Sequence, residues 1–281
     1  MNNKRVLLTG ATGLIGKEAI EPLQNSGFEV FAPSLEEFNL FNEHSVNSFL
    51  EKVKPEYLLH FAWFTGEGYL ESELNYDFFN SSVNLLEKFI KNGGKRAVFS
   101  GTCFEYDFCD KPIKETQSLN PKSIYAQCKN ELRANAEKIA EKYDISFAWG
   151  RIFYVYGKNE AENRLGGALA TKLTKNEVVT INSAQLQRDY VYSKDIARAF
   201  VAILNSDING SINISKNNGM TLEDFALEYA KQLGKENYLN IKYENSTQPL
   251  KIIGDNARLT KELGFKFKYN HAQAVAEILS K

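Results

Sequence analysis

The chain has 281 residues, of which 43% are hydrophobic and 25% are charged, which is typical of one large globular domain with at most a small appended lobe. Its formal net charge of -1 offers no excess of positive charge to nucleic acid or to an anionic membrane. No apolar run approaches the roughly 18 residues of a membrane span. The three cysteines, Cys103, Cys109 and Cys128, match no zinc spacing, so we expect no metal site and a reducing, cytoplasmic location.

The first half of the chain alternates short apolar runs with longer amphipathic stretches. The expected strands are residues 5–9, 29–32, 57–62, 96–100 and 145–152, and the expected helices are residues 16–26, 46–53, 81–91 and 123–143. The expected strands are continuous apolar runs, as in strands that are buried on both faces. Because helices of this length separate them, the pattern predicts a parallel sheet with right-handed crossovers.

The pattern loosens after Gly157. Helices are expected at residues 168–173, at residues 195–204 and from Thr221 onward, strands at residues 178–181 and 211–214, and a last strand and helix within residues 240–281. We therefore expect an α/β fold with a Rossmann-type doubly wound parallel sheet and a small C-terminal α/β lobe. The core should comprise residues 1–157 and the lobe mainly residues 158–281, with residues 178–215 partly returning to the core.

A glycine-rich turn follows the first strand directly. Residues 9–16 read T-G-A-T-G-L-I-G, with the glycine spacing G-x-x-G-x-x-G. Gly10 permits the tight turn, Gly13 lets the backbone approach a pyrophosphate, and Gly16 lets helix and strand pack closely. Because the turn joins the first strand to the first helix, it predicts a dinucleotide site more strongly than an ordinary structural turn. The residues expected to bind the cofactor there are Gly10, Thr12, Gly13, Leu14, Ile15 and Gly16.

The end of the second strand leaves the choice of cofactor open. NAD favours a carboxylate for its ribose at this position, and NADP favours an arginine. Ala32-Pro33-Ser34 stands there instead, and Glu36 and Glu37 follow only beyond it. The sequence therefore predicts a dinucleotide that is either NAD or NADP.

Tyr125 and Lys129 lie four residues apart at the start of an expected helix, which places them on one face, one turn apart. A nearby ammonium lowers the pKa of a phenol, and such a phenol can exchange a proton with a sugar oxygen. Thr102 follows the fourth strand, where ligands bind in open α/β sheets. The alternatives are a tyrosine at the rim of a cleft and an ordinary turn hydroxyl. The pattern favours a catalytic set of Thr102, Tyr125 and Lys129.

Together these features resemble the extended short-chain dehydrogenase/reductases, the NAD-dependent epimerase/dehydratase family in its nucleotide-sugar branch. Residues 99–106 are similar to the family's F-S-S-[ST]-x-x-V-Y, and residues 60–62 to its H-x-A. Residues 150–157 are similar to its L-R-x-x-N-V-Y-G, with Tyr154 in place of the usual Asn. Residues 187–199 are similar to its R-D-[FY]-[VI]-x-V-x-D-[VI]-A-x-A. The resemblance thus extends over most of the chain.

The resemblance implies a role for each of these residues. Thr102 and Tyr125 would hydrogen-bond the oxygen at the reacting carbon, Lys129 would bind the nicotinamide ribose, and Ala62 would contact the cofactor. Arg188 would bind the diphosphate of a nucleotide-diphosphate sugar, because a guanidinium suits phosphate oxygens. The alternative for Arg188 is a surface ion pair with a neighbouring aspartate. The remaining substrate-binding candidates are Tyr154 and Arg164. Relatives commonly form homodimers, so a homodimer is expected.

Within the family, absent residues narrow the reaction. Dehydratases carry an Asp-Glu pair after the catalytic Thr, where this chain has Cys103-Phe104. The epimerising reductases add a Cys and a His, and Phe104 and Asn159 fall on those positions. We expect a 4-ketoreductase of a nucleotide 4-keto-6-deoxyhexose, for which NADPH is the favoured cofactor. One alternative is a nucleotide-sugar 4-epimerase that retains NAD. Another, of a different class, is a protein that binds a dinucleotide without turnover.

Overall fold

The structure is a computed structural model that describes residues 4–280, and it divides into two compact units. The first unit comprises the chain up to Asp107, residues 118–151 and residues 197–212. The second comprises residues 108–117, residues 152–196 and the chain from Asn213 onward. Residues 152–157 and 178–196, which the sequence analysis placed in or near the core, therefore lie in the second unit.

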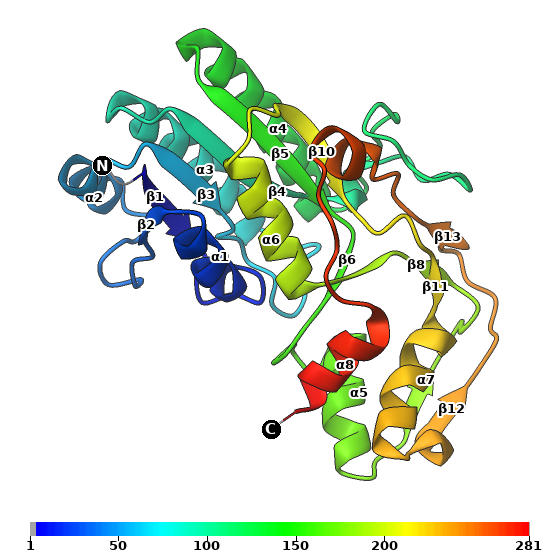
Figure 1. The fold of residues 1–281 in the computed structure, drawn as a ribbon. Helices are drawn as coiled ribbons and strands as arrows, with labels where there is room; N and C mark the ends of the chain where they lie inside the picture. Colours follow the sequence, from blue (N-terminus) through cyan, green and yellow to red (C-terminus); the bar gives the residue numbers. More distant parts are fainter. Residues whose placement is uncertain (1–3, 281) are drawn as a thin grey trace. The chain divides into compact units, whose positions relative to one another are not determined.

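The first unit contains a six-stranded sheet in the order β10-β5-β4-β3-β1-β2 (Figure 1). The strands are β1 (Lys4–Thr9), β2 (Phe28–Phe31), β3 (Tyr57–His60), β4 (Arg96–Thr102), β5 (Ser146–Ile152) and β10 (Gly210–Ile214). β1 pairs in parallel with both β2 and β3, and β3 pairs in parallel with β4. The strand order therefore changes direction beside β1, which confirms the expected doubly wound α/β fold and marks where ligands bind in such sheets.

Helices cover both faces of this sheet, with α3 and α4 on one face and α1 and α6 on the other (Figure 1). They are α1 (Ile20–Asn25), α2 (Glu43–Val53), α3 (Leu74–Lys91), α4 (Ile124–Tyr143) and α6 (Ser193–Leu204). One apolar core joins α2, α3 and α4 to the strands through buried side chains that include Leu50, Phe89, Leu132, Phe99 and Trp149. Burial of such side chains is the main source of stability for this layer.

The ends of these helices follow from particular residues. The Asn42 side chain accepts a hydrogen bond from Ser45 N and caps α2, and Ser123 caps α4 in the same way through Ala126 N. After α1 the chain turns at Gly27, whose φ of +81° suits a residue without a Cβ. The first helix differs from expectation, because it opens with a 3-10 turn, η1 (Gly16–Ala19), before α1 begins.

The second unit is built from short elements around an aromatic core. Its strands are β6 (Tyr154–Tyr156), β7 (Val179–Ile181), β8 (Gln187–Arg188), β9 (Tyr190–Tyr192), β11 (Met220–Thr221), β12 (Leu239–Ile241) and β13 (Lys251–Ile252). Its helical segments are α5 (Leu165–Thr174), α7 (Leu222–Leu233), η3 (Glu236–Tyr238), the π-helical η4 (Arg258–Glu262) and α8 (His271–Leu279). In the core, the Phe225 ring stacks on Tyr190 at a centroid distance of 4.0 Å and on His271 at 4.8 Å. Within residues 4–280, none of the helices has the length and apolar character needed to cross a membrane.

Candidate functional site

The glycine turn lies where the ends of β1 and β3 meet. Gly10 has a φ of +71°, and a Cβ there would lie 2.7 Å from the backbone of both Phe61 and Ala62. At Gly16 a Cβ would lie 2.1 Å from the Gly10 carbonyl oxygen. At Gly13 the nearest such contact is the Gly10 oxygen at 3.2 Å, so its other side is open. The turn thus depends on glycine for two reasons, close packing at Gly10 and Gly16 and an accessible backbone at Gly13.

A nicotinamide dinucleotide, which the family resemblance implies, fits these residues. The backbone around Gly13 is exposed, and Thr12 beside it is exposed as well. Leu14 and Ile15 are half-buried next to them, and Ala62 N is held by the Thr9 hydroxyl at 3.4 Å. An open, glycine-rich turn with an exposed backbone is the arrangement that accepts a pyrophosphate. Among residues 4–280, no cluster of three or more His, Cys, Asp or Glu side chains is placed to hold a metal ion.

A buried histidine fixes the end of β3 next to this turn. His60 Nδ1 lies 2.6 Å from Thr9 Oγ1, and its Nε2 lies 2.9 Å from Ser82 Oγ. Because Ser82 donates its own proton to the Phe78 carbonyl, His60 Nε2 carries the hydrogen and Nδ1 accepts from Thr9. Burial, together with the charge of Lys129, lowers the pKa of His60 to about 3. His60 is therefore a neutral structural link between β1, β3 and α3.

Thr102 is the last residue of β4 and caps the single turn η2 (Cys103–Glu105). Its hydroxyl accepts from Phe104 N at 3.3 Å and hydrogen-bonds the Tyr125 side chain. Its backbone N–H donates to Glu105 Oε1 at 2.8 Å. The structure thus brings two of the predicted catalytic residues into direct contact, at the edge of the sheet where parallel strands end.

Tyr125 lies in the first turn of α4 and is 9% exposed. The Tyr69 ring packs against its ring at 5.0 Å, and its backbone N–H donates to the Leu70 carbonyl. Burial raises the pKa of the Tyr125 phenol above its ordinary value, and the hydrogen bond with Thr102 opposes this less strongly. The expectation of a lowered pKa for Tyr125 is therefore wrong for the free protein, because loss of solvation raises it.

Lys129 is 2% exposed and lies one turn after Tyr125. Its ammonium donates to the Ser100 carbonyl at 2.9 Å and lies 3.8 Å from the centre of the Trp63 ring. Burial lowers the pKa of Lys129 to about 7, and the carboxylate of Glu105 acts in the opposite direction. A buried ammonium with this pKa changes its charge near neutral pH, which is common at functional sites.

Trp63 and Asn75 complete this site, and neither was predicted as a site residue from the sequence. Asn75 is fully buried, accepts from Trp63 Nε1 at 2.8 Å, and donates to the carbonyls of Tyr69 and Ser72. The indole is thereby fixed over the Lys129 ammonium, a favourable cation–π arrangement. The signal in the sequence that could have indicated it was the tryptophan directly after the H-x-A segment.

In the second unit, two of the predicted substrate-binding residues lie together. Arg188 is 2% exposed, and its guanidinium lies 5.5 Å from the centre of the Tyr154 ring. It donates to Gln248 Oε1 at 2.8 Å and to backbone carbonyls, including that of Pro249 at 3.1 Å. The neighbouring Asp189 instead accepts from backbone N–H groups, so the alternative of a surface ion pair for Arg188 is wrong. Arg164, the remaining candidate, occupies the N-cap position of α5.

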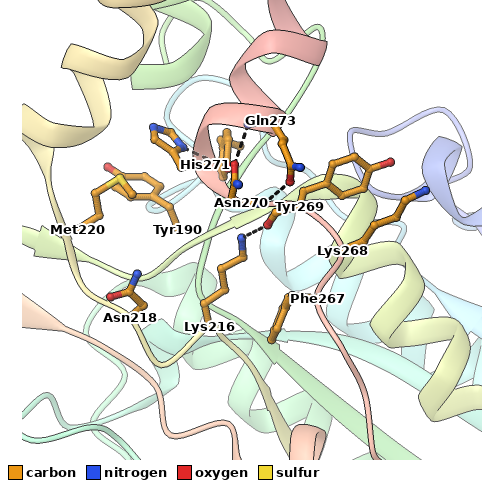
Figure 2. Close-up of a pocket in the computed structure, with 11 residues that line it drawn as sticks. Tyr190, Lys216, Asn218, Met220, Phe267, Lys268, Tyr269, Asn270, His271 and Gln273 are labelled. Atoms are coloured by element: carbon orange, nitrogen blue, oxygen red, sulfur yellow. Dashed lines mark hydrogen bonds between the residues drawn. The ribbon is translucent and has the colours of Figure 1, made fainter.

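A cavity of about 490 Å³ also lies within the second unit, and none of the predicted site residues lines it. Figure 2 shows the Lys216 ammonium in this cavity directed at the carbonyl of Tyr269, to which it donates at 2.6 Å. Burial lowers the pKa of Lys216, and the carboxylates of Asp195 and Asp189 act against this. Because these charges offset the cation, the cavity has no clear preference for an anion.

Three comparisons place this geometry among known proteins. The family model described as "NAD dependent epimerase/dehydratase family" matches residues 6–215. The chain is 26% identical over 260 residues to dTDP-6-deoxy-L-talose 4-dehydrogenase (NAD(+)) of Aggregatibacter actinomycetemcomitans, covering 80% of this chain and 90% of that one. It is 26% identical over 299 residues to GDP-6-deoxy-D-talose 4-dehydrogenase of the same organism, covering 99% and 97%.

Among solved structures, the fold is similar to that of a UDP-glucose 4-epimerase with UDP-glucose from Thermotoga maritima. The TM-score is 0.85 at 24% sequence identity, and the match covers 98% of this chain and 96% of that one. At this identity the likeness concerns the fold alone, because one fold can carry several reactions.

Proposed function

The chain belongs to the NAD dependent epimerase/dehydratase family and is an NAD(P)-dependent enzyme of the short-chain dehydrogenase/reductase type. From this premise we propose that it is a 4-ketoreductase of a nucleotide 4-keto-6-deoxyhexose. The single observation that carries the proposal is the contact between Thr102 and Tyr125 next to the buried Lys129. These three side chains are what a carbonyl reduction needs beside a hydride donor.

The relatives favour a reaction at carbon 4. Two of them are named as 4-dehydrogenases of 6-deoxyhexoses, one linked to dTDP and one to GDP. A 4-dehydrogenase and a 4-ketoreductase catalyse the same interconversion of alcohol and ketone in opposite directions. Because the two relatives differ in their nucleotide, the base of the substrate is left to experiment.

Tyr125 can serve as the proton donor of the reduction. When bound, the nicotinamide supplies a hydride to carbon 4 of the sugar. The C4 oxygen then gains negative charge, takes the Tyr125 phenolic proton and becomes a hydroxyl, and Tyr125 later regains a proton from solvent. A phenol whose pKa burial has raised is protonated at neutral pH, which is the form that a proton donor requires.

The other side chains position these groups. The Thr102 hydroxyl hydrogen-bonds Tyr125 and would also reach the C4 oxygen. Lys129 would bind the ribose of the cofactor, and Gly10, Gly13 and Gly16 would form the turn on which its pyrophosphate lies. We further propose NADPH as the reductant.

For the substrate we propose that Arg188 binds the diphosphate, with Tyr154 beside it and Arg164 as a further cation. The Arg188 guanidinium now donates to Gln248 and to carbonyl oxygens, and phosphate oxygens are acceptors of the same kind. In this proposal residues 1–157 mainly bind the cofactor, and residues 158–281 mainly bind the sugar nucleotide. A homodimer is also proposed.

The test is a panel of dTDP-, GDP-, CDP- and UDP-linked 4-keto-6-deoxyhexoses, each incubated with the protein and either NADPH or NADH. We expect the absorbance of the reduced nicotinamide to fall with one sugar nucleotide. Interconversion of two sugars without net oxidation of the cofactor would instead identify a 4-epimerase. Binding of cofactor without any turnover would favour a non-catalytic role.

The variant Tyr125→Phe tests the assigned proton donor. It should lower kcat by about 10²- to 10⁴-fold, because the proton transfer is lost. Its affinity for NADPH should be retained, because the ring still fills the same space. Tyr143→Phe is the matched control, since Tyr143 lies at the exposed end of the same helix α4. Undiminished turnover by Tyr125→Phe would show that this phenol is not the proton donor.

A further inference from the structure

A fully buried carboxylate stands directly behind the predicted catalytic residues. Glu105 closes the η2 turn and has no exposed surface. Its Oε1 accepts from Thr102 N at 2.8 Å and from Trp149 Nε1 at 3.0 Å, and its Oε2 accepts from Arg151 Nε at 2.6 Å. Buried carboxylates are rare unless they are paired and hydrogen-bonded, and Glu105 is both. The family stretch to which this segment is similar has an apolar residue at this position.

The neighbouring glycine provides the space for this carboxylate. A Cβ at Gly101 would lie 2.0 Å from Trp149 Nε1 and 2.6 Å from Glu105 Oε1. Any side chain at residue 101 would therefore displace the indole or the carboxylate. Gly101 and Glu105 are the two positions at which residues 99–106 depart from the family pattern, and in the structure the absence of a Cβ at Gly101 leaves room for both the Trp149 indole and the Glu105 carboxylate.

From Glu105 a chain of contacts leads to the reacting groups. The carboxylate holds the backbone of Thr102, and the Thr102 hydroxyl hydrogen-bonds Tyr125. Behind it, Arg151 is 2% exposed and also donates to Tyr106 Oη at 2.9 Å. A salt bridge that is buried in this way is weak evidence of stabilisation, because desolvating both ions offsets their attraction. The Glu105–Arg151 salt bridge is instead well suited to holding the carboxylate, and with it the Thr102 backbone, in one position.

The same carboxylate acts on Lys129. Glu105, from η2, raises the pKa of Lys129 against the larger effect of burial. Besides Glu105, His60 from β3 interacts electrostatically with Lys129 and is neutral, and Tyr125 lies one turn earlier on the same helix. The centres of the Trp63 and Trp149 rings lie 3.8 Å and 5.9 Å from its ammonium. Glu105 therefore provides the negative charge that stabilises the Lys129 ammonium.

We propose that Glu105 is a positioning residue of the reaction, which sets Thr102 against Tyr125 and supplies the buried negative charge opposite the Lys129 ammonium. This inference rests on the proposed function for its catalytic consequence. It does not require a particular sugar, because its effects on Thr102 and on Lys129 exist in the protein alone.

Glu105→Gln removes the charge and keeps the shape. We expect kcat to fall about 10- to 100-fold, since a small displacement of Thr102 weakens its alignment with Tyr125. The KM for the sugar nucleotide should change little, because Glu105 does not contact it. We also expect the protonation midpoint of Lys129 to move to lower pH by about one unit, since the negative charge that favours the ammonium is gone. Glu105→Asp, which keeps the charge, should retain most of that midpoint.

The midpoint is measured on the free protein by NMR of 13C- and 15N-labelled lysine, with Lys129→Arg to assign the signal. If Glu105→Gln leaves Arg151 unpaired and fails to fold, Glu105→Gln/Arg151→Gln removes both charges and serves in its place. Glu137→Gln is the control, because it breaks the Arg133 ion pair on the outer side of the same helix α4. It should leave both readouts unchanged.

The proposal is overturned if folded Glu105→Gln, or the double variant, has wild-type kcat and a wild-type Lys129 midpoint. Recovery of full activity in the double variant would likewise show that Glu105 only neutralises Arg151. These outcomes are distinguishable from failure of the proposed function. If no sugar in the panel turns over, the Lys129 midpoint and the affinity for NADPH as a function of pH still test the role of Glu105.

Discussion

At Lys129, the requirements of function and of stability oppose each other. Its pKa falls from an ordinary 10.5 to about 7 because the side chain is buried. Between these values the unfolded chain holds a proton that the folded protein releases, so the free energy of unfolding rises with pH across this window. Below pH 7 the folded protein must carry the buried charge, and the destabilisation is complete.

Lys129→Met should therefore stabilise the protein while abolishing turnover. We expect the free energy of unfolding below pH 7 to increase by a few kcal/mol, at about 1.4 kcal/mol per pKa unit, less about 1 kcal/mol for the lost hydrogen bond to Ser100. The gain should shrink as the pH rises toward 10.5. Urea denaturation at several pH values measures it, and exposed Lys138→Met on α4 is the control. A Met variant less stable than wild type at pH 6.5 would contradict this argument.

At the level of elements, the start of α4 determines where Tyr125 lies. Ser123 caps this helix by accepting from Ala126 N at 3.2 Å. Ser123→Ala should lower the free energy of unfolding by about 1 kcal/mol and should also lower kcat several-fold, because the first turn frays. Asn42→Ala, which removes the cap of α2, should cost similar stability and leave kcat unchanged. Equal effects of both variants on kcat would mean that the cap contributes only to stability.

The sequence predicted those elements whose signals are local. Continuous apolar runs identified the strands of the main sheet, Gly27 marked the end of the first helix, and the four-residue spacing placed Tyr125 and Lys129 on one face of α4. It expected α3 to begin at residue 81, whereas the helix begins at Leu74, because the exposed Leu74 and Tyr76 obscure its amphipathic pattern. The strands of two or three residues in the second unit are too short to show any period.

The candidate site was predictable to the same extent. Thr102 was placed at the end of a strand by its position after an apolar run, and its roles and those of Tyr125 and Lys129 stay predictions for the experiments above to test. The contacts of Glu105 with Trp149 join residues 44 apart in the sequence, and no local pattern reports such a pair. Trp63 over Lys129 is likewise a tertiary contact. Motifs identify the reacting groups, but long-range packing sets their charges.

At the level of the whole molecule, the two units contain groups whose titrations have opposite effects on stability. Burial lowers the pKa of His60 in the first unit from 6.5 to about 3, so the unfolded chain binds more protons in this window and stability falls as the pH drops below 6.5. Burial raises the pKa of Asp189 in the second unit from 3.8 to about 7, so stability falls as the pH rises through that range. In the free energy of unfolding of the whole chain, the effects of His60 and Asp189 partly cancel between about pH 4 and pH 6.5.

A difference between two proteins isolates the contribution of His60. His60→Gln keeps a donor for Ser82 and removes the titration. Relative to this variant, the wild type should lose about 1.4 kcal/mol of unfolding free energy for each pH unit from 6.5 down to 4. The two tryptophans of the chain, Trp63 and Trp149, both lie in the first unit, so their fluorescence in urea reports the unit that contains His60. A difference that stays constant over this range would mean that His60 is accessible to protons in the folded protein, and the buried link between β1, β3 and α3 would then be wrong.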